Sequence, residues 1–413
     1  MSDLRTDIRA AFQKRLDRAP MAADFPERVA RRVARPRSHR RLMVVLVAAA
    51  AIALLGVGGG VLLAAHRPHP VPPARPVPTA RPTPTPAPSA TPTPVPTATP
   101  TPRAAAPTYS SVVLTGGAAG NMVVAPDGSV WFGAGDRIGR MAPGGQITYY
   151  TVPDVVWITL GPDGAIWFTG PQGSIGRMTL QGSVTSFPLP TPQESATDIV
   201  TGPDGALWFT EMSGNKIGRI TTSGAVTEFP LPDRGGVQCG EVCPAGITVS
   251  GGDVWFAESQ SSAAGGDRIG RMTPGGDLTE FPLPTTNADP YYVAATADGS
   301  IWFSEQHGIG RITPSGSIQE YSIPGQSAAV TVDGLTVGSD GAVWFTANTH
   351  DNPDLPLKST GSILGRIDAS GQITTYPLPA AAIGAGVLSE GAGGTLVFPS
   401  YDGTSNRVWT VTP

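Results

Sequence analysis

The sequence predicts an all-β fold, a seven-bladed β-propeller, preceded by a single transmembrane helix and a Pro-rich linker. Trp-Phe pairs recur about every 40 residues, which is the length of one four-stranded blade. The pairs begin at residues 131, 167, 208, 255, 302 and 344, and a degenerate seventh copy lies at Val397–Phe398. An Ile-Gly-Arg element follows most of the pairs, and Asp-Gly turns precede five of them. Seven copies therefore predict seven blades.

The stretch from Gly202 to Pro232 contains the parts of one repeat unit in order. A Pro-Asp-Gly turn leads into Leu-Trp-Phe, an Ile-Gly-Arg run follows, and a Ser-Gly turn precedes Val-Thr-Glu-Phe. Short β-branched and aromatic runs separated by Gly, Pro and Asp are typical of strands joined by tight turns. With residues 197–200 added in front, the unit supplies four strands, which we name A to D from the propeller axis outward.

The chain before the propeller divides into three segments. Residues 1–41 are basic and are expected to lie in the cytosol, residues 42–65 carry no charge and are long enough for a transmembrane signal-anchor helix, and residues 66–107 are rich in Pro and Thr. Seven arginines lie in residues 28–41. Basic segments beside a transmembrane helix remain in the cytosol. We therefore expect a single-pass protein of the cell membrane, with residues 108–413 forming an extracytoplasmic propeller.

Charge separates the two ends of the chain and limits the partners of the propeller. Residues 1–41 hold 12 Lys/Arg and 5 Asp/Glu, whereas residues 108–413 hold 12 Lys/Arg and 27 Asp/Glu, a net charge of 12 − 27 = −15. Such a negative domain repels phosphate backbones, so nucleic acid is not an expected partner. The expected partners are the membrane, through residues 42–65, and a small-molecule or cell-envelope ligand.

Strand order predicts how the ring closes and which face carries the ligand site. The last copy ends after its third strand, so Tyr109–Leu114 is expected to supply the outermost strand of blade 7. The A–B and C–D turns lie on one face, and the B–C loops and D–A connections lie on the other. The insertions at 233–242, 260–266 and 348–362 all fall on this second face. Longer loops on one face predict that this is the binding face.

The repeat resembles the virginiamycin B lyase (streptogramin lyase) family over essentially all of 108–413. The motif that carries the resemblance is W-F-T-E-x-x-G-N-K-I-G-R-I-T-x-x-G-x-x-T-E-F-P-L-P, and residues 202–232 follow it almost letter for letter. The resemblance implies a seven-bladed propeller that opens a cyclic depsipeptide by elimination with Mg²⁺. It also implies a histidine base in a Pro-His-x-Ile element and nearby glutamates.

This chain departs from the family pattern at the histidine. The seven equivalent positions are Gly120, Val156, Thr197, Ala245, Tyr291, Asp333 and Gly386. The chain therefore resembles a membrane-anchored form of the family that lacks the catalytic histidine.

Acidic residues form the main candidate site. Glu211, Glu258 and Glu305 follow three consecutive Trp-Phe pairs, and Asp333 begins the next blade. We expect all four at the channel mouth, with Glu258, Glu305 and Asp333 as possible Mg²⁺ ligands. The alternative is that they are solvated loop acids or caps of backbone amides.

Other candidate residues lie in the loops of the same face. Glu305 and His307 are candidate catalytic groups, and His350, Tyr291 and Tyr292 are candidate ligand contacts together with Glu211, Glu258 and Asp333. Cys239 and Cys243 are expected to form a local disulfide in an extracytoplasmic loop.

Three functions fit these observations. The first is a non-catalytic, membrane-tethered propeller that binds a ligand or a cell-envelope component on its loop-rich face. The second is a metal-dependent lyase or hydrolase that uses the acidic residues. The third is an interaction platform that acts through the basic cytosolic segment. Fold alone does not decide between them.

Overall fold

The computed structural model describes residues 106–413 with the exception of 116–118, 153–154, 171–172, 192–194, 233–243, 260–265, 307, 326–329, 351–358 and 403. The predicted segments 1–41, 42–65 and most of 66–107 lie outside this part of the chain. So do Cys239, Cys243 and His307, and the side chain of His350. Within the described part, no helix is long and apolar enough to span a membrane.

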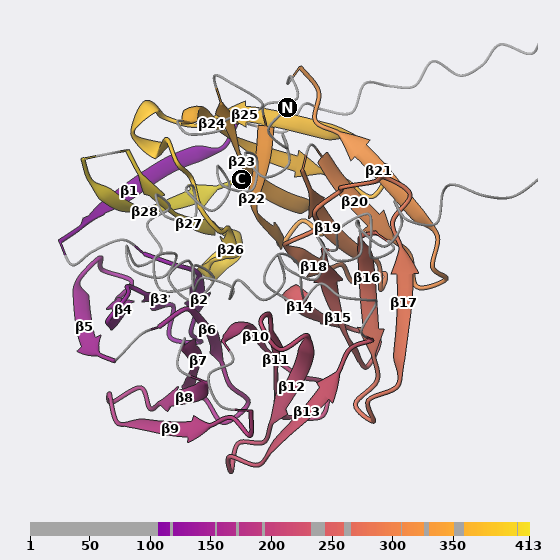
Figure 1. Ribbon diagram of the computed structural model, residues 1–413. Helices are drawn as coiled ribbons and strands as arrows, with labels where there is room; N and C mark the ends of the chain where they lie inside the picture. Colours follow the sequence, from indigo (N-terminus) through magenta and orange to yellow (C-terminus); the bar gives the residue numbers. More distant parts are fainter. Residues whose placement is uncertain are drawn as a thin grey trace, which may run out of the picture. The chain divides into compact units, whose positions relative to one another are not determined.

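Seven four-stranded antiparallel sheets form the domain, which confirms the predicted seven-bladed propeller (Figure 1). Blades 1 to 3 contain β2 (Met122–Val124), β3 (Val130–Gly133), β4 (Arg137–Met141) and β5 (Ile147–Thr151); β6 (Trp157–Leu160), β7 (Ile166–Gly170), β8 (Ser174–Met178) and β9 (Val184–Pro188); and β10 (Ala196–Thr201), β11 (Leu207–Glu211), β12 (Lys216–Ile220) and β13 (Val226–Pro230). Blades 4 and 5 contain β14 (Pro244–Ser250), β15 (Asp253–Glu258), β16 (Arg268–Met272) and β17 (Leu278–Pro282); and β18 (Val293–Ala295), β19 (Ile301–Glu305), β20 (Gly308–Ile312) and β21 (Ile318–Ser322). Blade 6 contains β22 (Val330–Val337), β23 (Val343–His350), β24 (Ser359–Ile367) and β25 (Ile373–Pro377).

Blade 7 joins the two ends of the propeller. It contains β26 (Ser389–Glu390), β27 (Leu396–Tyr401) and β28 (Asn406–Thr412), with β1 (Thr108–Leu114) as its outermost strand. Strand β1 pairs with β28 from Thr108↔Thr412 to Leu114↔Asn406, which confirms the predicted closure. Two short 3₁₀ turns, η2 (Ala380–Ala382) and η3 (Ala392–Gly394), flank β26. The pairing covers both edges that an open ring would leave unpaired.

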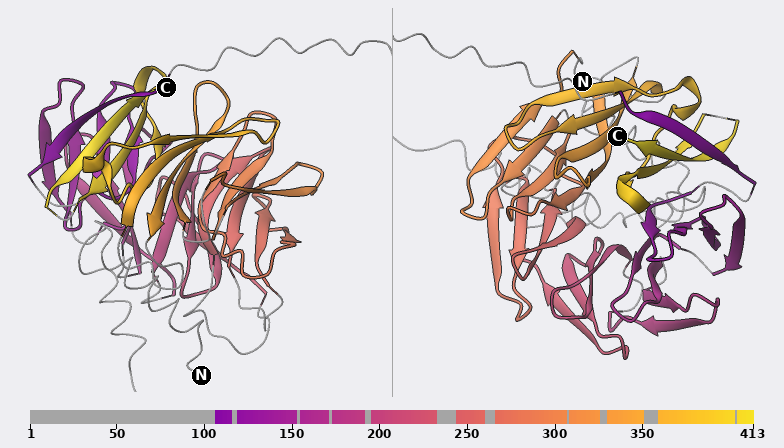
Figure 2. Two further views of the ribbon diagram at one scale, coloured as in Figure 1. Left: turned by 90° about the horizontal axis from the view of Figure 1, so that it is seen from above. Right: turned by 180° about the vertical axis from the view of Figure 1, so that it is seen from behind.

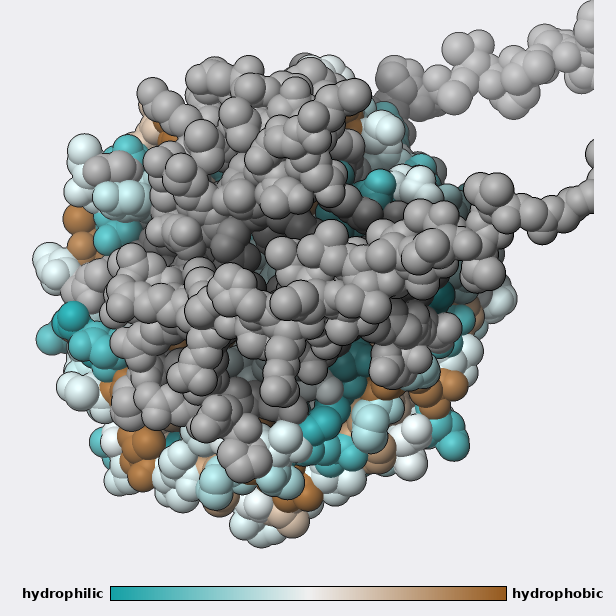
Figure 3. Space-filling model, viewed as in Figure 1, coloured by the Kyte–Doolittle hydropathy of each residue, from teal (hydrophilic) through white to brown (hydrophobic). Residues whose placement is uncertain are grey.

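The innermost strands surround the central axis in the order β2, β6, β10, β14, β18, β22 and β26 (Figure 1, and Figure 2, right). Each of them starts on the face that carries the B–C loops and D–A connections, which we call the loop face. Strand β1 begins on the opposite face, because Thr108 lies beside Thr412 and Leu114 lies beside the β27–β28 loop. On the face shown in Figure 3, hydrophobic residues along the coloured rim are scattered among hydrophilic ones.

Aromatic side chains fill the space between neighbouring blades. The Trp of one blade lies in the same buried cluster as the Phe of the next, as Trp167 does with Phe209, and Trp208 with Phe256. Both Trp167 and Trp208 are fully buried. The recurring Trp-Phe pairs therefore exist because each blade must cover both faces of its sheet.

The recurring Asp-Gly turn and Ile-Gly-Arg arginine form one unit with the Trp. In blade 3 the Asp204 carboxylate accepts hydrogen bonds from the Trp208 indole N–H at 3.0 Å and from Arg219 Nε at 2.5 Å. Burial opposes ionisation of Asp204, but these donors outweigh it and lower the pKa of the carboxyl. Blades 2 and 6 repeat the arrangement at Asp163 and Asp340. The arginines are therefore part of the scaffold.

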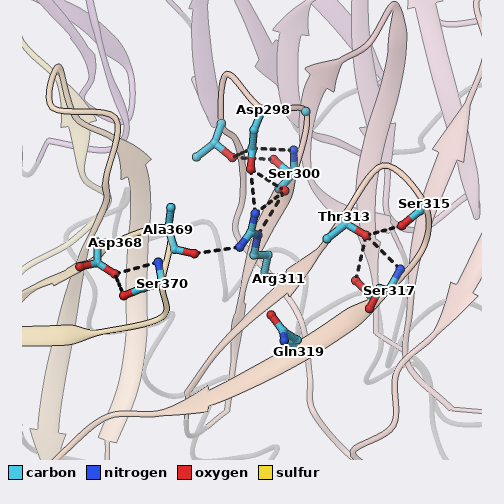
Figure 4. A network of polar contacts seen from close by, with 12 residues as sticks. Asp298, Ser300, Arg311, Thr313, Ser315, Ser317, Gln319, Asp368, Ala369 and Ser370 are labelled. Atoms are coloured by element: carbon cyan, nitrogen blue, oxygen red, sulfur yellow. Dashed lines mark hydrogen bonds and ion pairs between the residues drawn. The ribbon is translucent and has the colours of Figure 1, made fainter. Parts of the chain in front are cut away.

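Blade 5 uses the same elements in a different way. Here Arg311 Nη2 donates to Asp298 Oδ2 at 2.7 Å, and Nη1 donates across to the Ala369 carbonyl of blade 6 at 3.0 Å (Figure 4). Ser300 accepts hydrogen bonds from the same guanidinium group. The arginine thereby links two adjacent blades on the face opposite the loop face.

The glycine of Ile-Gly-Arg makes room for the Phe of the same blade, and we predict that this space is required. A Cβ atom on Gly218 would lie 2.0 Å from the Phe209 ring, which is buried on all sides. The substitution Gly218→Ala should lower the free energy of unfolding by about 1–3 kcal/mol, since an overpacked core must shift. Gly144→Ala is the matched control, because no atom lies within 4 Å of its added Cβ. Urea denaturation of both variants tests this, and equal stabilities would contradict the packing argument.

Candidate functional site

The strand register defines two side-chain positions per blade at the start of the innermost strand. In six blades the innermost strand pairs one residue with the Phe of the Trp-Phe pair, from Met122↔Phe132 to Leu335↔Phe345. The residue just before the paired one belongs to what we call the inner ring, and the residue before that belongs to the outer ring. The outer ring consists of the seven positions at which the family resemblance predicts one histidine, namely Gly120, Val156, Thr197, Ala245, Tyr291, Asp333 and Gly386. The inner ring consists of Asn121, Trp157, Asp198, Gly246, Tyr292, Gly334 and Val387.

Aromatic residues of the inner ring meet across the axis. The rings of Trp157, in blade 2, and Tyr292, in blade 5, have centroids 6.5 Å apart and planes inclined by 30°. The ring of Tyr291 contacts that of Tyr292 edge-on, with the two ring centroids 4.8 Å apart. Blades 2 and 5 are not neighbours, so their side chains can approach only over the central channel. This places Tyr292 over the axis at the loop-face end of the channel, with Tyr291 beside it.

Backbone hydrogen bonds hold these aromatic residues in place. The Trp157 amide donates to Thr169 Oγ1 at 3.1 Å, and the Tyr292 amide donates to Ser304 Oγ at 2.9 Å. The two hydroxyls occupy the same position, directly after the Trp-Phe pair of their own blade. Each aromatic residue is therefore anchored by its own blade, while its ring points toward the axis.

Two polar members of the inner ring connect adjacent blades. The Asn121 amide accepts from Ile158 N at 2.9 Å and donates to Ile158 O at 2.7 Å. Asp198 makes the corresponding contact two blades further on, accepting from Ile247 N at 3.0 Å and from its own neighbour Ile199 N at 2.7 Å. A neutral amide and a carboxylate thus perform the same structural task in blades 1 and 3.

Asp198 also has an electrostatic role at the mouth. Burial raises the pKa of Asp198 to about 7, although the two backbone amides oppose the shift. Burial also raises the pKa of Tyr291 to about 12, and the nearby Asp198 adds to that shift. The Asp198 side chain is half-buried. A carboxyl that titrates near neutral pH inside a mouth is characteristic of functional sites.

A glycine lets the backbone of Tyr291 approach blade 4 closely. Asp198 and Tyr291 belong to blades 3 and 5, and the inner-ring residue of blade 4 between them is Gly246. A Cβ atom on Gly246 would lie 2.3 Å from the Tyr291 carbonyl oxygen. The Gly246 amide donates to that same oxygen at 2.8 Å. The close approach brings Tyr291 toward Asp198.

The predicted glutamates do not lie at the mouth with these residues. Glu211 and Glu258 are the last residues of their strands and are buried, on the sheet face that also carries the Phe side chain. The Glu258 carboxyl lies over Gly270 of β16, since a Cβ there would be 2.8 Å from Glu258 Oε1. Because side chains alternate along a strand, the last residue of β11 or β15 points between blades. The expectation of convergence at the mouth is therefore wrong for Glu258.

Glu305 also points away from the axis, toward the outermost strand of its blade. Burial raises the pKa of Glu305 to about 8, and a hydrogen bond with the Glu320 carboxyl and the charge of Asp267 act in the same direction. Glu320 in turn accepts from Thr285 N at 3.2 Å and Thr285 Oγ1 at 2.6 Å. These two carboxyls share a proton between blades 4 and 5.

Blade 5 lacks the lysine that neutralises Glu228 in blade 3, which explains why the pKa is raised at Glu305 and lowered at Glu228. The residue opposite Glu211 is Lys216, whose Nζ binds Glu228 Oε2 at 2.9 Å, whereas the residue opposite Glu305 is Gly308. A Cβ on Gly308 would lie 2.5 Å from a backbone carbonyl oxygen, so no side chain fits there. The carboxyl pair of blade 5 must therefore retain a proton.

Asp333 is separated from the other predicted acids. Its carboxylate accepts a short hydrogen bond from Asn348 Nδ2, within blade 6. Among the described residues, no group of three or more His, Cys, Asp or Glu side chains is arranged to hold a metal ion. The described positions of Glu258, Glu305 and Asp333 therefore do not fit a common Mg²⁺ site.

Sequence reasoning missed Asp198 and Trp157. Each lies one position before the residue that pairs with the Phe of its blade. Each therefore follows directly after an outer-ring position, where a histidine was expected. Comparison of the adjacent position across the seven copies shows an aromatic residue in two blades and one carboxylate, which is the signal that could have identified them.

Comparisons with known proteins agree with the repeat pattern. The sequence model of the virginiamycin B lyase family matches residues 108–266 and 237–412. A curated virginiamycin B lyase of Nocardia farcinica is 29% identical over 192 residues, which span 44% of this chain and 61% of the relative, less than two thirds of its length.

Solved structures are similar over the whole propeller. The crystal structure of virginiamycin B lyase from Staphylococcus aureus is 30% identical, with a TM-score of 0.62 over 74% of this chain and 99% of that one. A catalytically inactive variant of that enzyme, crystallised with quinupristin, is also 30% identical, with a TM-score of 0.63 and the same coverage. The extracellular domain of a putative one-component system of B. thetaiotaomicron shares the fold alone, at 16% identity and a TM-score of 0.54, over 70% of this chain and 40% of that one.

The proton shared by Glu305 and Glu320 predicts a pH dependence of stability. The pKa of Glu305 is higher in the folded chain than in the unfolded chain, so its contribution is favourable below about pH 4.5 and is lost as the pH rises to about 8. Glu305→Gln can still donate to Glu320 but cannot ionise. This variant should therefore be more stable than the wild type at pH 8, on the order of 2 kcal/mol, and equal to it near pH 4.

The matched control is Glu228→Gln in blade 3, where the sign is opposite. Burial raises the pKa of Glu228, but hydrogen bonds from Thr191 and Lys216 outweigh this and lower it. Removing that carboxylate should cost stability at pH 8. Urea denaturation at several pH values measures both effects. A Glu305→Gln variant that is less stable than the wild type at pH 8 would refute the shared proton.

Proposed function

Because the chain belongs to the virginiamycin B lyase family, we propose that it is a membrane-tethered, extracytoplasmic propeller that binds a ligand at the mouth of its central channel. The ligand is a small molecule or a component of the cell envelope. The site is the loop-face end of the channel, where Trp157, Asp198, Tyr291 and Tyr292 are the contact residues. Pockets of this kind combine apolar walls with a few converging polar groups.

The convergence of side chains from three blades is the observation that carries this proposal. Trp157 approaches Tyr292 across the axis, and Asp198 interacts with Tyr291 past the intervening blade. These residues differ from blade to blade, while the Trp-Phe pairs and Asp-Gly turns recur. A feature required by every blade would recur in every blade, so the variable inner ring is free to serve recognition.

Binding is a better account than the lyase reaction for this chain. None of the seven outer-ring positions is a histidine, and Glu258 and Glu305 point away from the axis. General-base catalysis requires a base within reach of the proton that it removes. The described mouth offers Asp198 as its titrating group near neutral pH, and Asp198 already accepts two backbone amides.

The position at the membrane is proposed from the sequence before the propeller. Residues 42–65 carry no charge, and the arginines precede them. Strand β1 begins on the face opposite the loop face, so a linker over 66–107 would join the propeller on that side. This arrangement would present the channel mouth away from the membrane.

Substitution at the mouth tests the binding proposal. We expect Trp157→Ala and Tyr292→Ala to abolish or weaken at least tenfold the binding of ligands found by screening the full-length protein, since each removes an anchor of the site. The screen includes quinupristin as a probe from the relative's structure, with the ring-opened product measured in parallel. Isothermal titration calorimetry gives the affinities.

Leu180→Ala is the matched control, since Leu180 is exposed and lies in a C–D turn on the opposite face. Ligands that bind this control and both mouth variants equally well would place the binding site elsewhere. Enzymatic opening of quinupristin by the wild-type protein would establish the lyase reaction in place of simple binding.

Protease added to intact cells tests the topology. An extracytoplasmic propeller should be released or cleaved without lysis of the cells, because the protease reaches only the parts of the chain outside the membrane. An epitope tag at the N-terminus should stay protected. Protection of the propeller until the cells are lysed would contradict the proposed orientation.

A further inference from the structure

We infer that the ligand of the channel mouth carries a positively charged nitrogen, which is held against the ring faces of Trp157 and Tyr292 beside the carboxylate of Asp198. This inference rests on the proposed binding function and specifies the chemical class of the ligand. Amines and quaternary ammonium groups have the required charge and size.

The charge of the axial positions favours a cation. The inner and outer rings together contain Asp198 and Asp333, and they contain no Lys, Arg or His. Asp333 already accepts from Asn348. A channel mouth lined by one sign of charge concentrates ligands of the opposite sign, and low-dielectric walls strengthen the effect. An anionic ligand would meet repulsion with no compensating basic residue among these positions.

Aromatic faces add a second, independent preference for a cation. The face of an indole or phenol ring carries a partial negative charge, so a cation within about 6 Å of the centroid is attracted to it. Trp157 and Tyr292 meet over the axis, and Gly246 and Gly334 place no side chain beside them. Trp157 and Tyr292 are both half-buried, so part of each ring remains accessible.

The comparison of Asp198 with Asn121 shows that the link between blades does not require the negative charge of Asp198. Both residues accept a hydrogen bond from the next blade, Asn121 from Ile158 N and Asp198 from Ile247 N. An amide is sufficient for that link in blade 1, so the negative charge of Asp198 is not needed to join the blades. Burial makes this charge costly, as the raised pKa of Asp198 indicates. A bound cation would offset the cost by supplying the missing opposite charge.

Proton release should accompany binding. The Ile199 and Ile247 amides donate to Asp198 from blades 3 and 4, and the charge of Asp198 acts on the titratable Tyr291 of blade 5. With a pKa of about 7, the Asp198 carboxyl is part-protonated at neutral pH. A cation binds the ionised form, so its affinity should rise as the pH increases from about 6 to about 8.

The experiment compares choline with its neutral carbon isostere, 3,3-dimethylbutan-1-ol, by calorimetric titration of the full-length protein. We expect choline to bind at least about tenfold more tightly than the isostere, as a partly desolvated cation–π contact and a nearby carboxylate allow. In Asp198→Asn, choline should lose about tenfold in affinity, while the affinity for the isostere stays unchanged and the thermal stability at pH 8 is no lower than that of the wild type, since the costly buried charge is gone. The rise in choline affinity with pH should disappear in this variant.

Each alternative result would decide against the inference. Equal binding of choline and the isostere by the wild-type protein would overturn it without any variant, as would the failure of choline to bind. Choline affinity that is unchanged in Asp198→Asn would exclude the carboxylate as its partner. If Trp157→Ala still abolishes binding of a neutral ligand from the screen, the binding function stands and only the cationic class is wrong.

Discussion

Closure of the ring is the constraint on which the rest of this structure depends. A four-stranded blade has two faces, and it can bury both only between two neighbours. The Trp of each blade therefore fills the interface with the next, as Trp208 does against Phe256. The pairing of β1 with β28 completes the circle, so the last blade also has neighbours on both sides. The recurring Trp-Phe pairs serve this requirement.

The propeller scaffold could be predicted from the sequence because it is local and repeated. Asp204, Trp208 and Arg219 recur with nearly constant spacing, and their hydrogen bonds lie within one blade. The outer strand at residues 108–114 could be predicted because the last copy is one strand short. The candidate site was harder to predict, since Glu258 and Glu305 follow the Trp-Phe pair on the side of the sheet that faces a neighbouring blade. One step in strand register decides whether a carboxylate faces the axis or a packed interface.

Asp198 shows the complementary difficulty. Its contacts with backbone amides are those of an ordinary structural residue, and Asn121 makes equivalent contacts without a charge. Its charge acts on Tyr291 of blade 5, whose backbone can approach blade 4 because Gly246 has no side chain. Three blades that are separate in sequence must be assembled before this environment exists. No local pattern contains that information.

The same comparison between blades gives different meanings to two unusual carboxyls. Glu305 is perturbed because blade 5 has Gly308 where blade 3 has Lys216, and its partner Glu320 lies within the same sheet. That perturbation concerns stability. Asp198 is perturbed at the axis, the one region of a propeller where non-neighbouring blades face each other. A ligand there contacts several blades at once, so substitutions at the start of the innermost strands can change the chemistry of a family member and leave its scaffold intact. In this chain the seven outer-ring positions are small, aromatic or acidic residues, and none is a histidine.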